Sequence, residues 1–399
     1  MKKGWEMKTV GEVCDVVNGG TPKTGVLEYW GGKHLWVTPA EMGKRLSPYV
    51  DDTERKISDL GLRDSSARML PPHSVILSSR APIGHLVINT KPMSTNQGCK
   101  GLIPGKQLEH KFLYYYLTSI VELLDSLGTG ATFRELSGGK LKEVPIPVPP
   151  LAEQQRIVGV LDEAFAGLAN AQANAEKNLQ NARALFESHF QSVFTHRGKG
   201  WVEKPLGECF RLKSGDGLIS KEMKGGVYHV FGGNGIAGQH NEFNLSGDNV
   251  IIGRVGALCG NARHITEKIW LTDNAFKLVD FNADFDNGFL TYLLNYKNLR
   301  SLARQAAQPV ISNSSLKDLK LDFPARTEQQ RIAAKFDALA TETQSLESLY
   351  QQKQAALAAL KKSLLHQAFC GALTAANRIV ACIEVWQRRA GFLERITRR

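Results

Sequence analysis

One pentapeptide occurs twice in this chain of 399 residues: Glu-Gln-Gln-Arg-Ile stands at 153–157 and again at 328–332. Each copy follows a segment that contains proline and opens a run of roughly 45 residues with almost no glycine or proline, as expected for a long helix. The repeat therefore predicts two related long helices, one in the middle of the chain and one near its end.

Apolar residues within both runs recur at steps of three and four, which is the spacing of a coiled-coil seam. A helix of this length needs a partner along its apolar stripe, and we expect the other copy to supply it in antiparallel orientation. The alternative is two separate amphipathic helices, each packed on its own domain. The predicted seam positions are Ile157, Leu161, Ala164, Leu168, Ala171, Ala175, Leu179, Ala182, Phe186, Phe190 and Val193 in the first run, and Ile332, Phe336, Leu339, Thr343, Leu346, Tyr350, Lys353, Leu357, Leu360 and Leu364 in the second.

The duplication extends to the segments that precede the helices. Shared landmarks include Gly4-Trp5 and Gly200-Trp201, the apolar runs that end at Arg80 and Arg254, and the elements Thr95-Asn96-Gln97 and Thr272-Asp273-Asn274. Short apolar runs alternate with glycine turns there, which favours mixed α/β domains. We therefore predict an α+β fold with an internal pseudo-twofold repeat. Its parts are a first globular domain over 1–150, a long helix over 151–199, a second globular domain over 200–324, a second long helix over 325–375, and a basic tail over 376–399.

Composition restricts the class of protein. Hydrophobic residues make up 42% and charged residues 22% of the chain, as in folded proteins, and no run reaches the roughly 20 apolar residues of a membrane span. We expect a cytoplasmic protein without a membrane segment. The six cysteines form no Cys-x-x-Cys pair, so neither a disulfide framework nor a zinc site is indicated. The net charge of +11 is only weak support for nucleic-acid binding, because the tail alone carries six arginines.

Catalytic and cofactor motifs are missing from the sequence. Residues 231–238, Phe-Gly-Gly-Asn-Gly-Ile-Ala-Gly, match a dinucleotide fingerprint, but a turn and a strand rather than a helix are expected after them, so we interpret them as a β-turn. There is no phosphate-binding loop, no (Asp/Asn)-Pro-Pro-aromatic strip for a flipped base, and no His-Glu-x-x-His metal pattern. The sequence predicts a chain that is not an enzyme and binds no metal or cofactor itself.

With this duplicated plan, the chain resembles the specificity (S) subunit of Type I restriction–modification systems. The motifs that carry the resemblance are residues 19–22, 28–32, 36–39 and 94–98, both Glu-Gln-Gln-Arg-Ile helix starts, and residues 368–374. The resemblance implies that each globular part is a target-recognition domain that reads one half of a split, asymmetric site in double-stranded DNA. It also implies that the helices act as a spacer and as a dock for two modification (M) subunits.

Cofactors and further partners follow from the same resemblance. The modification subunits are expected to bind S-adenosylmethionine and to methylate adenine, and translocating restriction (R) subunits are expected to use ATP and Mg²⁺. Two other interpretations remain at this point: a methyltransferase or nuclease that acts alone, and a coiled-coil scaffold that does not bind DNA. The tail departs from the family pattern and is compatible with an extra helix, a partner-binding arm or a disordered extension.

Candidate DNA contacts follow from residue chemistry, because Arg, Asn and Gln read base edges while Lys, Ser and Thr mostly hold phosphates. The candidates are Thr21, Lys23, Arg80, Asn96, Gln97 and Arg134 in the first domain, and Lys213, Lys221, Arg254 and Asn274 in the second. Arg80 and Arg254 are also candidates for supporting the fold, and Asn96 and Asn274 for forming turns. At the helix starts, the candidate partner-docking residues are Gln154, Gln155, Arg156, Gln329, Gln330 and Arg331.

Overall fold

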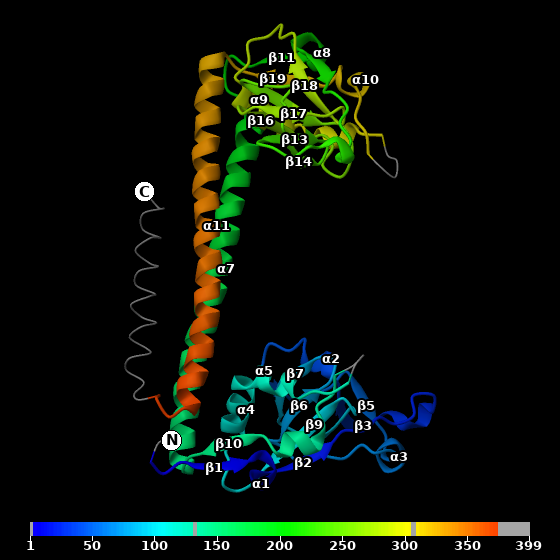
Figure 1. Ribbon diagram of the computed structural model, residues 1–399, viewed down its shortest axis with the longest axis vertical. Helices are drawn as coiled ribbons and strands as arrows, with labels where there is room; N and C mark the ends of the chain where they lie inside the picture. Colours follow the sequence, from blue (N-terminus) through cyan, green and yellow to red (C-terminus); the bar gives the residue numbers. More distant parts are fainter. Residues whose placement is uncertain (1–2, 131–133, 305–308, 374–399) are drawn as a thin grey trace. The chain divides into compact units, whose positions relative to one another are not determined.

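A computed structural model describes residues 3–130, 134–304 and 309–373 (Figure 1). The chain divides into two compact units: residues 1–175 with 352–399, and residues 176–351. Both long helices cross this division, so each unit contains one globular domain together with part of each helix. The predicted basic tail over 376–399 lies outside the described residues.

The globular domain of the first unit contains three sheets. A two-stranded ribbon joins β1 (Glu6–Thr9) to β10 (Pro145–Val148). A five-stranded sheet has the order β2 (Cys14–Asn18), β9 (Cys99–Pro104), β6 (Val75–Ser79), β7 (Ile83–Asn89), β4 (Tyr49–Val50), and a three-stranded sheet has the order β5 (Arg55–Ile57), β3 (Trp30–Val37), β8 (Met93–Thr95). The helices are α1 (Val10–Val13), α2 (Pro39–Met42), α3 (Asp59–Arg63), α4 (His110–Ser119), α5 (Val121–Ser126) and α6 (Gly138–Lys142), with a 3-10 turn η1 (Leu27–Tyr29).

The globular domain of the second unit is built in the same way. Its ribbon joins β11 (Val202–Pro205) to β19 (Lys320–Phe323). A four-stranded sheet has the order β12 (Arg211–Ser214), β18 (Ala275–Val279), β15 (Asn249–Gly253), β16 (Ala262–Ile265), and a three-stranded sheet has the order β14 (Gly235–His240), β13 (Tyr228–Gly232), β17 (Ile269–Leu271). Its helices are α8 (Leu206–Cys209), α9 (Asn287–Tyr296) and α10 (Asn313–Leu316), with 3-10 turns η2 (Ser220–Glu222) and η3 (Leu299–Leu302).

Strand pairing repeats between the two domains. In both, the first strand pairs antiparallel with the strand that leads into a long helix. In both three-stranded sheets, the middle strand pairs antiparallel with a strand that follows it in sequence and parallel with a still later strand. The first domain adds the edge strand β4, which pairs parallel with β7. The repeated topology confirms the predicted α+β fold class with an internal repeat.

The long helices are α7 (Leu151–Thr195) and α11 (Arg326–Phe369). In the first unit, Arg156 contacts Leu373 and Phe165 lies under Lys361. In the second unit, Arg183 pairs with Glu347 and Phe190 contacts Phe336. Partner numbers fall along α11 as they rise along α7, so the helix segments run antiparallel in each unit, where they lie side by side (Figure 1).

Every predicted seam position of both helices is buried or half-buried. The spacing of three and four therefore marks the contact between the helices, and the coiled-coil prediction is confirmed. The seam also continues into the domain cores: Ile157 and Leu364 belong to the same apolar cluster as Phe112 of α4, and Phe336 belongs to the cluster of Phe289 of α9. Each domain is thus packed on both helices rather than on one.

Within the described ranges, no helix is long and apolar enough to cross a membrane. The five cysteines in those ranges are free thiols, four of them buried, and burial raises the pKa of Cys14 and of Cys99 to about 12. Such thiols behave as small core residues rather than as nucleophiles.

Candidate nucleic-acid interface

Gln154 fixes the start of the first long helix to the first domain. Its side chain is fully buried. The Oε1 atom accepts a hydrogen bond from the backbone N–H of Glu109 at 2.9 Å, while Nε2 donates to the carbonyls of Gln107 and Pro149 at 2.9 and 2.8 Å. Glu109 in turn caps α4 by accepting from the N–H of Phe112. The first turn of α7 is therefore locked to the start of α4.

Gln329 makes the same three contacts in the second unit. Its Oε1 accepts from the N–H of Asp286 at 2.9 Å, and its Nε2 donates to the carbonyls of Asp284 and Pro324 at 3.0 and 2.9 Å. Asp286 caps α9 by accepting from the N–H of Phe289. The repeated pentapeptide thus encodes a glutamine clamp, which we define as Gln154 or Gln329 with its three backbone partners.

A tyrosine–aspartate pair makes a second link between each long helix and its domain, with the aspartate eight residues after the clamp glutamine and the tyrosine on α4 or α9. The hydroxyl of Tyr115 donates to Asp162 at 2.5 Å, and the hydroxyl of Tyr292 donates to Asp337 at 2.7 Å. Burial, reinforced by the neighbouring carboxylate, raises the pKa of both tyrosines. Lys111 also binds Asp162, at 2.5 Å. Sequence reasoning missed these pairs, although the equal spacing of Asp162 and Asp337 from the two glutamines was a usable signal.

The clamps correct part of the docking prediction. Gln154 and Gln329 are 0% and 1% exposed, and their amide groups are occupied inside the domains, so they are not available to a partner. Gln155 and Gln330 are exposed.

The helix-start arginines differ between the units. Arg156 and Arg331 pair with Glu153 and Glu328, both at 2.6 Å. Arg156 additionally donates to the Leu373 carbonyl at 2.9 Å, and its side chain is 38% exposed against 69% for Arg331. Arg331 is the more accessible of the two.

Four of the candidate DNA contacts come together in the first domain. Asn96 donates through Nδ2 to the hydroxyl of Thr21 at 2.9 Å and accepts through Oδ1 from the N–H of Gly98 at 2.8 Å. Arg80 follows β6, and its Nε would lie 3.1 Å from a Cβ at Gly98. Gln97, which stands between Asn96 and Gly98 in the sequence, is exposed. Asn96 is occupied in the turn, as the turn-forming alternative expects, whereas Gln97 and Arg80 are placed at its edge.

The three cationic candidates of the first domain, Arg80, Arg134 and Lys23, have different surroundings. Arg80 lies 3.8 Å from the carboxylate of Glu135, which is also 3.6 Å from the buried Lys100. Arg134 is held by α5, since it pairs with Asp125 at 3.2 Å and donates to the carbonyl of the same residue at 2.6 Å. Lys23 is exposed. The side chain of Arg134 is therefore held by contacts within the domain, whereas the side chain of Lys23 is exposed to solvent.

In the second domain, Arg254 and Asn274 meet at the end of β15. The N–H of Arg254 donates to the carbonyl of Asn274 at 2.9 Å. The guanidinium lies 3.4 Å from the hydroxyl of Ser214 and over the ring of Phe276, and its buried Nε has no hydrogen-bond partner among the described residues. Lys213 precedes Ser214 and is exposed. Lys221 is exposed in η2, and no contact among the described residues joins it to Arg254.

The glycine cluster at 231–238 is the β13–β14 hairpin, which confirms the turn interpretation. Gly233 approaches the end of β15 so closely that a Cβ would lie 1.9 Å from the carbonyl oxygen of Val255 and 3.0 Å from that of Asn274. Glycine is required there by close packing, not by a phosphate. The hairpin turn consequently lies beside Arg254, a neighbourhood that the sequence alone did not reveal.

Comparison with known proteins identifies the family. The model of the Type I restriction modification DNA specificity domain matches residues 2–178 and 198–355. The chain belongs to this family. Each match covers one globular domain and the first part of the long helix that follows it, so the family domain and the repeat found in the sequence coincide.

The relatives are specificity subunits. The chain is 33% identical over 237 residues to the Type I restriction enzyme MjaIX specificity subunit of Methanocaldococcus jannaschii, a match that spans 55% of each chain. It is 27% identical over 368 residues to the Type I restriction enzyme EcoprrI specificity subunit of Escherichia coli, which spans 87% of this chain and 90% of that one. The resemblance drawn from the sequence is confirmed, and neither the stand-alone enzyme nor the scaffold gains support.

The fold is shared with a solved structure from work on complex assembly and conformational transition of the type I R-M system. The two chains superpose with a TM-score of 0.74 at 19% identity, and the match covers 94% of this chain and 99% of the other. At this identity the comparison concerns the fold alone, and it confirms the two-domain arrangement with long helices.

Proposed function

We propose that this chain is the non-catalytic DNA-recognition subunit of a Type I restriction–modification complex and that it reads a bipartite, asymmetric site, one half with each domain. The observation that supports this most directly is the repeat of one scaffold with unlike surfaces. Arg80 and Arg254 follow equivalent strands, yet Arg80 faces Glu135 while Arg254 faces Ser214 and Phe276. Two domains of similar topology that present different side chains can bind two half-sites of different sequence.

The helices fix the distance between half-sites in this proposal and bind two modification subunits. At the helix starts, Gln155, Gln330 and Arg331 are the docking candidates, because their side chains are exposed. S-adenosylmethionine would be bound by the modification subunits, and ATP and Mg²⁺ by restriction subunits. Methylation of adenine requires extrusion of the base into an enclosed pocket, and that step belongs to the partners.

The test is single-molecule sequencing of host DNA for methyladenine, with and without this chain and with active partners in both cases. We expect methylation at one bipartite motif that disappears when the chain is removed. A second arm replaces residues 200–324 by the corresponding domain of a relative, which should change one half of the motif and leave the other intact. Methylation that persists without the chain would refute the proposal, as would a domain exchange that changes both halves.

Salt dependence separates the DNA-recognition role from that of a scaffold. Proteins that neutralise DNA phosphates lose affinity steeply as salt rises. The assembled complex should therefore bind duplex DNA more weakly at each step of added salt, whereas a scaffold without a DNA surface would give no binding to titrate.

A further inference from the structure

Arg55 stacks on two tryptophans in the small sheet of the first domain. It lies on β5, opposite Trp36 of β3. Its Cζ is 3.7 Å from the centroid of the Trp30 ring and 5.3 Å from that of Trp36, and the two indoles meet edge to face at 5.1 Å. Trp36 is buried whereas Arg55 is exposed. The indoles therefore form a platform that holds the guanidinium at the surface.

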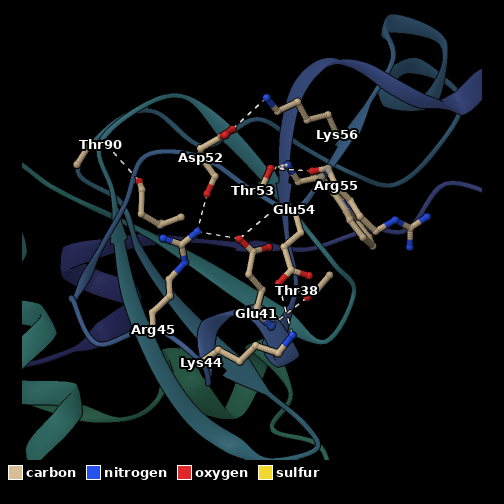
Figure 2. Close-up of polar contacts among 12 residues, drawn as sticks. Thr38, Glu41, Lys44, Arg45, Asp52, Thr53, Glu54, Arg55, Lys56 and Thr90 are labelled. Carbon is tan, nitrogen blue, oxygen red and sulfur yellow. Dashed lines mark hydrogen bonds and ion pairs between the residues drawn. The ribbon is translucent and has the colours of Figure 1, made fainter.

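The acidic neighbours of Arg55 are engaged elsewhere. Asp52 pairs with Lys56 at 3.0 Å, Glu54 with Lys44 at 3.4 Å, and Glu41 with Arg45 at 2.8 Å. Figure 2 shows Arg55 directed away from Glu41 and Glu54. Among the described residues, no ion pair or hydrogen bond involves its guanidinium.

An unpaired guanidinium on an aromatic face keeps its N–H edge free. Arginine stacks favourably on indole because its planar cation is weakly hydrated. Stacking also restricts the rotamers of a flexible side chain, so less entropy is lost when a ligand binds. The stacked guanidinium is therefore suited to contact with an anion.

The same indoles hold the loop that carries two candidate DNA contacts. Trp36 donates to the carbonyl of Gly20 at 2.9 Å, and Trp30 donates to the carbonyl of Lys23 at 3.3 Å. Between these anchors, the hydroxyl of Thr21 accepts from Asn96. Lys23 is exposed, and among the described residues its ammonium group forms no ion pair or hydrogen bond. Trp30 thus connects Arg55 to the loop of Lys23, and Thr21 connects that loop to Asn96, which precedes Gln97. Arg55 and Lys23 are two cations without an ion pair among the described residues.

We propose that Arg55, held on Trp30 beside Lys23, binds a backbone phosphate of the first half-site and so positions the duplex without reading its sequence. This inference rests on the proposed function. Roughly half to two-thirds of protein–DNA hydrogen bonds go to phosphates and sugars, with arginine and lysine among the donors, and these contacts fix register and orientation. Trp30 and Trp36, on which Arg55 stacks, bind the backbone of the loop that carries Thr21, and Thr21 in turn binds Asn96 beside the base-reading candidate Gln97.

The test uses the assembled complex with its modification subunits. Arg55→Ala should weaken duplex binding about 10-fold at 0.1 M salt and reduce the salt slope by about one unit, equally for cognate DNA and for DNA with a scrambled first half-site. The methylated motif should stay unchanged. Arg55→Lys, which keeps the charge, should restore the slope. Arg63→Ala is the matched control, because Arg63 is an exposed arginine of the same domain already paired with Asp64, and it should behave as wild type.

Replacing one charged phosphate by an uncharged methylphosphonate locates the phosphate that Arg55 contacts. Duplexes with a single methylphosphonate at successive positions of the first half-site should bind wild type poorly at one position, and Arg55→Ala should lose that sensitivity. An unchanged salt slope in Arg55→Ala would overturn the inference, as would an altered methylated motif, which would indicate base reading. If the wild-type complex methylates no bipartite motif, the proposed function itself fails, and this inference fails with it.

Discussion

The carboxamide of Gln154 meets the backbone N–H of Glu109 at 2.9 Å, across 45 residues of sequence. Glu109 is the N-cap of α4 and Gln154 lies in the first turn of α7. This one side chain therefore joins the first globular domain to the start of α7. Gln329 and Asp286 repeat the relationship at the same distance.

Gln154→Leu should lower the stability of the first unit by about 2–4 kcal/mol, because it leaves a part-buried N–H and two carbonyls without the hydrogen bonds that Gln154 makes to them. Urea titration followed by tryptophan fluorescence measures this loss. Gln155→Leu is the matched control, since Gln155 is exposed, and it should stay within about 0.5 kcal/mol of wild type. Equal losses in both variants would contradict the clamp.

Phe336→Ala should destabilise the second unit by about 3–5 kcal/mol. Phe336 is fully buried and contacts the rings of His189, Phe190 and Phe194, so alanine leaves a cavity in the seam. Leu349→Ala, on the same helix at a position that is 37% exposed, should change little. Thermal unfolding followed by circular dichroism compares the two variants, and similar midpoints would argue against a packed seam.

Arg80→Ala and Arg254→Ala should each alter recognition of a different half-site. Loss of a good base contact costs about 1–3 kcal/mol, so methylation of the cognate motif by the assembled complex should fall and one position of one half should relax. Arg211→Ala is the control, because Arg211 is exposed and paired with Asp280. Unchanged methylation in Arg80→Ala would remove that residue from the recognition surface.

Acid should destabilise the first unit through His110. Burial lowers the pKa of His110 from 6.5, the carboxylate of Glu109 opposes this, and His73 and Lys111 reinforce it. The folded chain thus binds this proton less readily than the unfolded chain, so stability is lost as pH falls below about 6.5 and the loss stops growing below the folded-state pKa. His110→Gln should flatten the stability profile between about pH 7 and 5. Identical profiles for the two proteins would refute this role.

Matched heptad insertions test the spacer role of the helices. Seven residues inserted after Ala175 in α7 and after Gln351 in α11 preserve the seam and lengthen each helix by about 10 Å. The gap between half-sites should widen, by up to about 3 base pairs at 3.4 Å per pair, while both half-sites keep their sequences. The methylated motif reports the result. A motif with an unchanged gap would exclude the helices as the spacer.

The sequence by itself determined the two helices, the seam and the duplication. These features depend on periodicity within a segment and on the recurrence of segments, so local spacing alone predicts them. Local sequence also identified the glycine cluster at 231–238 as a turn, because the residues after it are typical of a turn and a strand rather than of a helix.

The roles of individual polar residues were decided by the tertiary structure. Gln154 and Gln155 are adjacent and chemically identical, yet one is buried in a clamp and the other is exposed, because the domain covers only one side of the helix. Arg55 had no distinguishing sequence signal, since its platform comes from indoles 19 and 25 residues away. Whether an arginine or glutamine is a fold contact or a free donor depends on which groups long-range packing places beside it, and only the folded chain fixes that.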